Sequence, residues 1–220
     1  MKTVIGLIGV KTSGKSTIAN MIKEFIPNTE EVALADKLKN VCSSIFLVDR
    51  ENFDKQDLKE APFEHPFYLE MDDILEVLEN FNIKMTEEEA NLMYSGIVGI
   101  ELDTPRKIAQ IIGTEVLREA GDEDVHCNNL KIENSKVTVI SDVRFPNEFD
   151  YFNRQEHINF VPLYIQRDMA ENQVTEDSHP SEKLVFTFSD KCIKIDNNGE
   201  LISTEVQVKE AIDKYVYKYK

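Results

Sequence analysis

Residues 3–21 read TVIGLIGVKTSGKSTIANM, where an apolar run passes through a glycine-rich turn into residues with helical spacing. Val4 to Ile8 is typical of a buried strand, and the apolar residues from Ile18 to Ile22 predict a helix that begins near Lys15. Between them, GVKTSGKS matches the phosphate-binding pattern GxxxxGK[ST] in its required strand–loop–helix context. Backbone N–H groups and the positive end of the following helix bind polyphosphate in such loops. Lys15 is expected to contact the β- and γ-phosphates, and the Ser16 hydroxyl to bind Mg²⁺.

The composition is that of a globular protein large enough for one α/β domain with an insertion. The chain has 220 residues, of which 41% are apolar and 30% charged, and no stretch approaches the apolar length of a membrane span or signal peptide. We expect a cytoplasmic protein without a membrane partner. The net charge of −16 argues against nucleic-acid binding, which depends on Lys and Arg. Three widely spaced cysteines, at 42, 127 and 192, indicate buried free thiols and neither a disulfide framework nor a zinc site.

Residues 30–35 (EEVALA) predict a short strand that leads into a helix opening at Asp36. Two readings of Asp36 stay open. It is either an N-cap residue, or it belongs with Lys37 and Lys39 to the carboxyl end of a parallel strand, where open α/β sheets bind ligands.

Residues 49–103 are acidic and irregular and are interpreted as an insertion. Helical spacing predicts a helix over 71–81. Thr86 with Glu89 forms a capping box for a second helix that reaches about Tyr94.

A helix is predicted from the Thr104-Pro105 start to a stop at Ala120-Gly121. One side of it is apolar, and a polar ladder with a four-residue repeat follows another side: Arg106, Gln110, Thr114 and Arg118. The two arginines would stand about 18 Å apart at a rise of about 1.5 Å per residue. Gly113 lowers helix stability by about 1 kcal/mol relative to alanine, which suggests close packing or binding there.

The C-terminal third contains a second clear buried strand, 136–140, followed by Asp142 and Arg144. An acidic residue after such a strand is where phosphate-loop proteins position Mg²⁺. A helix is expected over 146–154, and a strand over 160–165 leads to Arg167.

The polar segment 168–188 is interpreted as a lid. His179 in it is read as a surface residue rather than a catalytic one. A last strand is expected over 191–195 and a closing amphipathic helix over 204–219. Strands that alternate with helices predict an α/β, phosphate-loop NTPase fold, a five-stranded parallel sheet flanked by helices, in one domain over 1–220.

The chain resembles the deoxynucleoside monophosphate kinases of large tailed phages in five segments: GVKTSGKST at 9–17, ADKLK at 35–39, TPRKIAQIIGTEVLR at 104–118, SDVRFPNE at 141–148 and DSHPSE at 177–182. The resemblance implies ATP- and Mg²⁺-dependent phosphoryl transfer to deoxynucleoside 5′-monophosphates. Two positions depart from the family. Ser16 stands where members often have Asp, and His126-Cys127 stands where Trp is common.

The resemblance also implies residue roles. ATP would be bound by Lys11, Thr12, Ser13, Gly14, Lys15, Ser16, Thr17 and Arg167. The acceptor would be bound by Asp36, Lys37, Lys39, Arg106, Gln110, Thr114, Glu115 and Arg118. Asp142 and Arg144 would lie at the transfer centre with Lys15, Arg106 and Arg118, and Ser16 and Asp142 would organise Mg²⁺.

Two other functions stay open. One is a phosphate-loop kinase for another small phosphorylated acceptor, such as phosphomevalonate, and the other is a nucleotide-dependent switch or ATPase. Base preference and oligomeric state, with a homodimer as one option, are not readable from the residues. Phage origin would place the protein in the host cytoplasm.

Overall fold

A computed structural model describes residues 1–119, 122–132 and 137–217. The chain divides into two compact units. Unit 1 comprises residues 1–34 and 131–220, and unit 2 comprises residues 35–130. Unit 2 therefore extends on both sides of the predicted insertion, 49–103. The phosphate-binding loop and the predicted lid both belong to unit 1.

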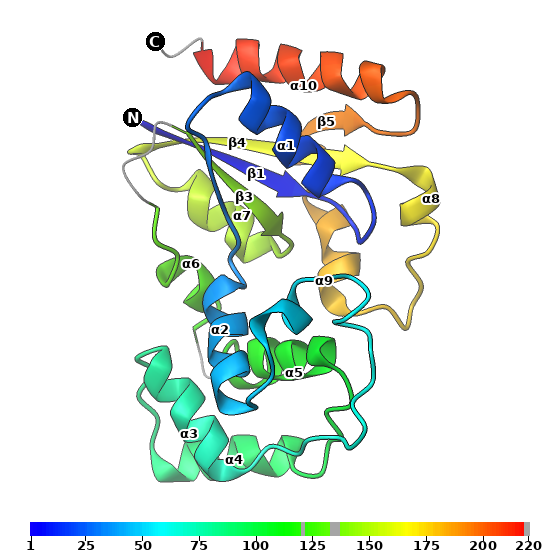
Figure 1. The fold of residues 1–220 in the computed structure, drawn as a ribbon. Coiled ribbons are helices and arrows are strands. Elements are labelled where there is room, and N and C mark those ends of the chain that lie inside the picture. Colours follow the sequence, from blue (N-terminus) through cyan, green and yellow to red (C-terminus); the bar gives the residue numbers. More distant parts are fainter. Residues whose placement is uncertain (120–121, 133–136, 218–220) are drawn as a thin grey trace. The chain divides into compact units, whose positions relative to one another are not determined.

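Unit 1 is built on a five-stranded, all-parallel sheet in the order β2-β3-β1-β4-β5 (Figure 1). The strands are β1 (Lys2–Ile8), β2 (Glu30–Val32), β3 (Val137–Val143), β4 (Ile158–Gln166) and β5 (Ile193–Asp196). The predicted α/β fold with five parallel strands is confirmed. β2 is shorter than the predicted 30–35, and β3 continues through Asp142, which the sequence analysis placed after the strand. Lys136 lies outside the described residues.

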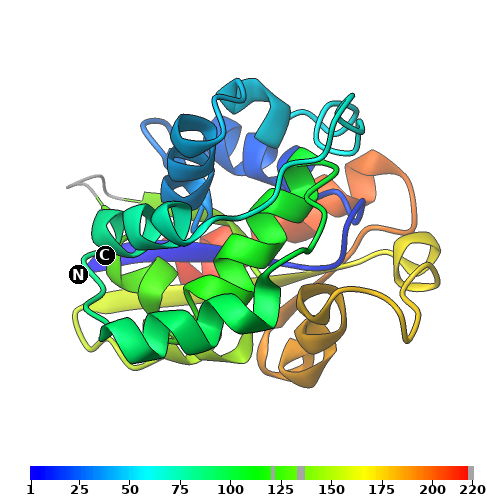
Figure 2. The ribbon, with the colours of Figure 1, turned by 90° about the horizontal axis from the view of Figure 1, so that it is seen from below.

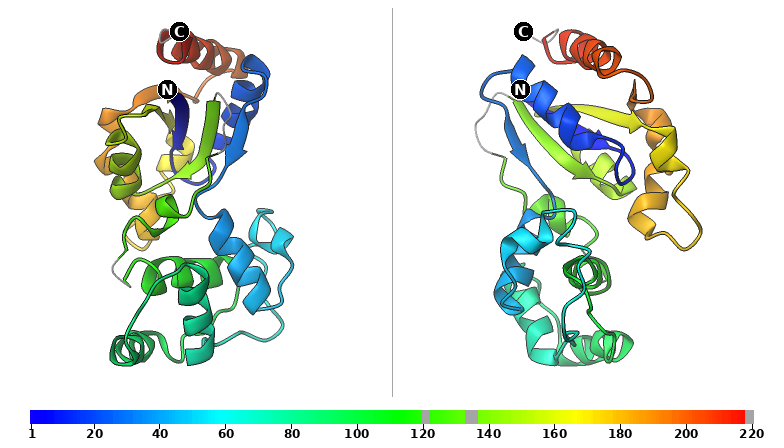
Figure 3. Two further views of the ribbon diagram at one scale, coloured as in Figure 1. Left: turned by 90° about the vertical axis from the view of Figure 1, so that its left-hand side faces the viewer. Right: turned by 45° about the vertical axis from the view of Figure 1, so that its right-hand side comes forward.

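Helices cover both faces of this sheet (Figures 1 and 3). α1 (Lys15–Phe25) and α10 (Leu201–Tyr215) pack against each other on one face. Between them and the sheet lies an apolar core whose largest fully buried side chains include Ile5, Leu7, Ile18 and Ile22. α10 begins three residues before the predicted position 204, and 218–219 fall outside the described residues.

The other face is covered by α7 (Pro146–Asn153) and by the 3₁₀ helix η3 (Leu184–Thr187). Aromatic rings fill this layer, at centroid separations of 5.4 to 5.8 Å between Phe149, Phe152, Phe160 and Phe188. Gly6 of β1 faces these rings, since a Cβ there would lie 2.8 Å from Phe160. The rest of the predicted lid forms α8 (Asp168–Glu171) and α9 (Pro180–Lys183), and η4 (Ser189–Lys191) leads into β5.

Unit 2 is helical and has a core of its own. It contains α2 (Asp36–Ile45), η1 (Arg50–Phe53), α3 (Met71–Asn80), α4 (Glu87–Ile97), α5 (Pro105–Ile111), η2 (Ile112–Val116) and α6 (Val125–Asn128). α3 packs against α4 (Figure 2). The core of unit 2 contains buried residues from all these elements, among them Leu38, Ile74, Ile108, Ile112 and Val116.

Several predicted features of unit 2 are confirmed. α3 lies where helical spacing predicted it, and the Thr86–Glu89 capping box is formed, with the Glu89 N–H donating to Thr86 Oγ1 at 3.3 Å. α4 continues past Tyr94 to Ile97. Thr104 caps α5 by accepting a hydrogen bond from the Lys107 N–H at 3.2 Å.

One of the two open readings of Asp36 is wrong, and the helix predicted from Pro105 needs a correction. Ala35, not Asp36, is the N-cap of α2, and the Asp36 carboxylate accepts from Arg50 at 2.8 Å. The helix from Pro105 is not α-helical to its end. It becomes a π-helix over Ile112–Val116, with i→i+5 hydrogen bonds from Leu117 N–H to Ile112 O and from Glu119 N–H to Thr114 O. The predicted stop at Ala120-Gly121 lies outside the described residues.

Within the described parts of the chain, no helix has the length and apolar character needed to cross a membrane. Cys42 and Cys127 are buried free thiols as predicted, whereas Cys192 is partly exposed.

Candidate active site

The loop between β1 and α1 has the backbone of a phosphate cradle. Gly9, Thr12 and Gly14 have φ of 154°, 63° and 102°, and all three values are positive, in the range that glycine adopts most easily. A Cβ at Gly9 would lie 2.7 Å from Ser13 Oγ and 2.9 Å from Ile165 O. The Ser13 hydroxyl is buried and makes no hydrogen bond within the described residues. These contacts keep the loop tightly wrapped.

Two side chains hold the loop from opposite directions. The Lys15 ammonium folds back and donates to the carbonyl oxygens of Gly9 and Val10, both at 2.7 Å. From the segment after β5, Asn197 Nδ2 donates to Ser13 O at 2.7 Å, and its Oδ1 accepts from Thr204 Oγ1 at 3.0 Å. No side chain of the described residues caps the N-terminus of α1, and its first turn has no acidic residue. The helix N-terminus therefore suits an anionic ligand.

The carboxyl end of β3 lies beside the start of the loop, because Val143 pairs with Ile8 in the sheet register. Asp142 and Arg144 flank that pair. Asp142 Oδ1 accepts from the Leu34 N–H at 2.6 Å. The backbone of Arg144 is fixed by the buried carboxylate of Glu148, whose Oε2 accepts from the N–H groups of Arg144 and Phe145 at 2.7 and 3.0 Å.

Two residues of the segment after β4 also touch the loop. Arg167 Nη1 donates to Thr12 O at 3.1 Å. Glu182 of α9 accepts from the Lys11 N–H at 2.6 Å, and its other oxygen lies 3.3 Å from Arg144 Nη1. His179 was expected to be a surface residue. It is partly buried and caps α9, with Nδ1 accepting from the Ser181 N–H at 3.2 Å.

In unit 2, two of the charged residues predicted for the acceptor, Asp36 and Lys39, take part in a network of side chains around Arg50. Arg50 is its centre, since its guanidinium contacts the side chains of Asp36 at 2.8 Å and Asn40 at 2.7 Å and pairs with Asp54. Lys39 also contacts Asp54, at 3.0 Å, and these ion pairs lower the Asp54 pKa against an opposing effect of burial. Arg50 lies in the irregular segment and carries no motif signal.

The polar ladder passes through the π-helix. In an α-helix of 3.6 residues per turn, a four-residue repeat drifts by about 40° at each step. The wider turn at Ile112–Val116 uses more residues per turn and so reduces this drift for Thr114 and Arg118. Arg106 Nε donates to Glu60 Oε1 at 2.7 Å, and Arg118 Nη1 to Glu123 O at 3.0 Å. The side chains of Gln110 and Thr114 are half-buried.

Glu115, also in the π-helix, differs from the other predicted acceptor residues. Burial raises its pKa, and the neighbouring Glu119 carboxyl adds to this through a hydrogen bond and charge repulsion. A carboxyl group with a raised pKa is a better hydrogen-bond donor to a neutral polar group than a partner for an anion.

The π-helix is packed against its neighbours at Gly113. A Cβ there would lie 2.8 Å from Leu38 Cδ2 of α2, and His126 Nε2 lies 3.4 Å from the Gly113 carbonyl oxygen. The close packing predicted at this glycine is thus with Leu38. His126 is buried, and burial, aided by the charge of Arg118, lowers its pKa to about 4.

Lys37 belongs to the same part of unit 2. Its ammonium lies 4.6 Å from the centroid of the Phe81 ring and donates to Asn129 Oδ1 at 2.6 Å. The edge of Phe81 meets the ring of His126, with centroids 6.2 Å apart. His126 therefore fills an aromatic packing position between Gly113 and Phe81.

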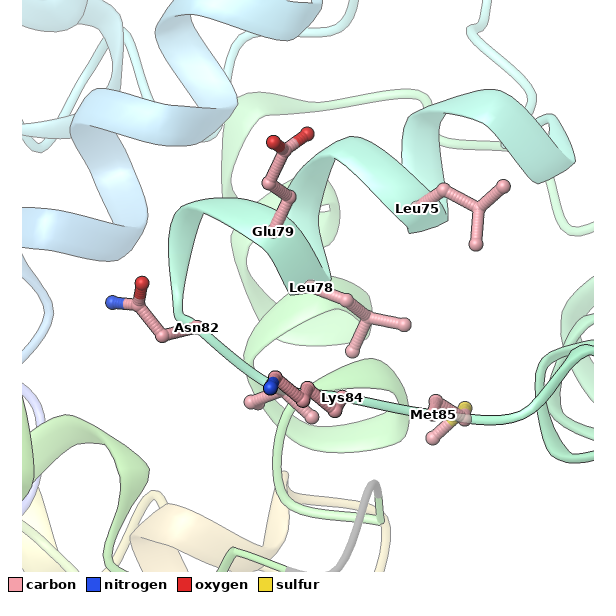
Figure 4. A pocket seen from close by; sticks show the side chains of 7 residues that line it. Leu75, Leu78, Glu79, Asn82, Lys84 and Met85 are labelled. Carbon is pink, nitrogen blue, oxygen red and sulfur yellow. The ribbon is translucent and has the colours of Figure 1, made fainter.

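A pocket of about 520 Å³ opens elsewhere in unit 2 (Figure 4). It is formed by the end of α3 and the segment that follows, and its lining is Leu75, Leu78, Glu79, Asn82, Ile83, Lys84 and Met85. The lining is mostly apolar, and none of the predicted acceptor residues belongs to it.

The predicted site residues are thus distributed over both units. All the predicted donor residues, with Asp142 and Arg144, lie in unit 1, and all the predicted acceptor residues lie in unit 2. Sequence reasoning missed Glu148, Glu182, Asn197 and Arg50. Glu148 and Glu182 share a local signal, because each stands two residues after a helix-starting proline, a position from which a side chain can cap preceding amides.

The loop fits a nucleoside triphosphate. The Lys11 N–H already binds a carboxylate, and the first turn of α1 has no acidic residue that would repel a phosphate. Mg²⁺ is commonly held by one or two protein oxygens together with substrate phosphates. The exposed Ser16 hydroxyl and the half-buried Asp142 carboxylate supply oxygens of that kind.

Comparison with known proteins gives two relatives. A protein of Acanthamoeba polyphaga mimivirus, provisionally named a deoxynucleotide monophosphate kinase, is 26% identical over 226 aligned positions that cover 96% of each chain. The deoxynucleoside-5′-monophosphate kinase of Escherichia phage T5 is 33% identical over 84 positions, which cover 36% of this chain and 34% of that protein. No family model matches the sequence. The chain is therefore similar over almost its whole length to a protein named as a nucleotide kinase.

Proposed function

We propose that this protein is a kinase that transfers the γ-phosphoryl group of ATP, with Mg²⁺, to deoxynucleoside 5′-monophosphates and releases the diphosphates. The observation that carries the proposal is the group of residues at one edge of the unit 1 sheet. There the phosphate loop, Asp142, Arg144 and Arg167 converge through the 3.1 Å contact to Thr12 and the pairing of Val143 with Ile8. The names of the two relatives support the choice of acceptor.

Phosphoryl transfer requires little covalent chemistry from the protein, so its residues act by positioning and by charge. The loop N–H groups and Lys15 would hold the donor phosphates. Arg144 and Arg167 would offset the negative charge that spreads over the transferred group. Mg²⁺, held by Ser16 and Asp142, would supply further charge neutralisation at the phosphate oxygens. The acceptor oxygen is already anionic at neutral pH, and Asp142 therefore serves as metal organiser rather than general base.

The acceptor would be bound in unit 2 by the ladder on α5 and η2 and by the charged residues of α2. Arg106 and Arg118 carry the positive charge that a monophosphate requires. Their present partners include Glu60 and a backbone carbonyl, and a phosphate that forms charge-assisted bonds can compete with both.

A coupled assay of ADP formation tests the proposal, with the four deoxynucleoside monophosphates, their ribose counterparts and phosphomevalonate as acceptors. Turnover with at least one deoxynucleotide, and none with phosphomevalonate, is expected. Turnover that depends on phosphomevalonate alone would replace the acceptor class. ATP hydrolysis that no acceptor stimulates would favour the switch or ATPase.

Matched variants test the residue roles. Lys15→Ala is expected to abolish turnover. Arg106→Ala is expected to lower kcat/KM for the monophosphate at least tenfold while leaving ATP binding unchanged. Lys107→Ala on the same helix removes the same charge, pairs only weakly with Asp103 at 3.8 Å, and is the control. Equal effects of Arg106→Ala and Lys107→Ala would reject the acceptor assignment.

A further inference from the structure

The phosphate loop already has an anion bound to it, and that anion is a side chain of the protein. Glu182 Oε2 accepts from the Lys11 N–H at 2.6 Å, and Oε1 lies 3.3 Å from Arg144 Nη1. The Glu182 side chain is 16% exposed and that of Arg144 is 33% exposed, so the contact between them is partly shielded from water. One carboxylate thus connects a loop amide to a guanidinium.

Both groups are ones that a phosphate would use. The Lys11 N–H belongs to the loop, and Arg144 flanks the strand end beside it. A carboxylate and a phosphate both offer anionic oxygens to N–H donors, and bonds of this kind are stronger than those between neutral groups. The two anions therefore compete for the same donors.

We propose that Glu182 is a positioning residue that occupies a phosphate-oxygen position in the nucleotide-free protein and is displaced when the triphosphate binds. While it is there, it keeps the Lys11 amide and the Arg144 guanidinium oriented. When it leaves, it frees both for the donor. This inference rests on the proposed function only in that the loop binds the phosphates of the donor.

The local structure lets Glu182 be presented and withdrawn. α9 is a single turn that starts at the His179 cap, and the Glu182 N–H donates to His179 O at 2.9 Å. The turn is anchored by the buried Ser181 and Val185 on either side of Glu182. A change of the Glu182 rotamer, or of this one turn, is enough to release the loop, and the sheet stays as it is.

The proposal predicts a change in nucleotide affinity opposite in direction to the change that a purely structural role predicts. If Glu182 only stabilised the fold, its loss would weaken nucleotide binding. If it competes with phosphate, a neutral replacement strengthens binding, by roughly tenfold if the hydrogen bond to a charged group contributes at the low end of its usual range.

The experiment measures binding to the full chain by calorimetry, with no acceptor present. Mg·ATP and inorganic pyrophosphate are titrated into wild type, Glu182→Gln and Glu176→Gln. Glu176 is exposed and lies in the same segment, so its replacement makes the same change of net charge away from the loop. Glu182→Gln should bind both ligands roughly tenfold more tightly, and Glu176→Gln should match wild type.

Binding by Glu182→Gln that is equal to or weaker than that of Glu176→Gln would overturn the proposal. Glu182→Asp is the second variant, because it keeps the charge but shortens the reach to Lys11. It should tighten binding by less than Glu182→Gln does. If the Gln variant fails to fold, the comparison of Glu182→Asp with wild type tests the proposal instead. If wild type binds Mg·ATP but phosphorylates no monophosphate, the proposed function fails while this comparison still stands.

Discussion

Replacement of Asn197 should loosen the phosphate loop. Its side chain connects Ser13 O in the loop, at 2.7 Å, to Thr204 Oγ1 in α10, at 3.0 Å. Asn197→Ala removes both hydrogen bonds. The Thr204 hydroxyl, in a residue that is 1% exposed, keeps only a 3.4 Å contact to Asp196 O.

The magnitude follows from those two bonds. Each contributes about 0.5–1.5 kcal/mol net, so the variant should lose about 2 kcal/mol of stability. For a unit of this size the midpoint of thermal unfolding should fall by roughly 8 °C. The loop must then be ordered when the ligand binds, which should raise the Kd for Mg·ATP roughly fivefold or more.

Thermal unfolding with and without Mg·ATP, together with calorimetric titration, measures both effects. Asn80→Ala is the control, because Asn80 is exposed and its side chain bonds only within α3, to Glu76 O at 2.9 Å. Thr204→Val removes only the partner that orients Asn197 and should give about half of the loss. If Asn197→Ala binds Mg·ATP as tightly as Asn80→Ala does, the side chain does not order the loop and the reasoning is refuted.

Two further predictions concern unit 2. Gly113→Ala should lower stability by about 1 kcal/mol or more, because the new methyl group would meet Leu38 at 2.8 Å. Gly96→Ala in α4 should raise stability by up to about 1 kcal/mol, because its methyl group would meet no described residue within 4 Å beyond its chain neighbours and its own helix. Urea unfolding measures both changes, and a stabilised Gly113→Ala would contradict the packing. The pKa of His126 is about 4 in the folded protein, against an ordinary value of 6.5, so the unfolded chain binds the proton first as the pH falls. Wild type should therefore lose about 2 kcal/mol of stability between pH 7.5 and 5, and His126→Gln should not lose it. Equal pH dependence of the two proteins would refute this.

Much of the fold was predictable because its signals are local. The buried strands, the Thr86–Glu89 capping box and the proline at the start of α5 each depend on neighbouring residues, and the parallel order follows from strands that alternate with helices. The π-helix was not predictable. It arises where Gly113 meets Leu38, and no pattern within residues 104–118 reports the approach of α2.

The candidate site also has parts with local sequence signals and parts that depend on tertiary contacts. The phosphate loop was readable because its glycines, Lys15 and Ser16 are consecutive and its function depends on backbone geometry. The contacts of the loop with Glu182 and Asn197 span 171 and 184 residues of sequence, and neither residue has a local pattern that indicates its partner. The assignment of the acceptor residues stays a prediction.

The sequence by itself therefore determined the parallel α/β sheet and the strand–loop–helix that carries the predicted phosphate site, because short-range periodicity and loop chemistry are sufficient for that. Only the tertiary structure decided what holds the loop and what occupies it. Hydrogen bonds such as those from Lys11 N–H to Glu182 and from Asn197 to Ser13 form when the ends of β3, β4 and β5 meet at one edge of the sheet. Their energies depend on distances in space that separation along the chain does not encode.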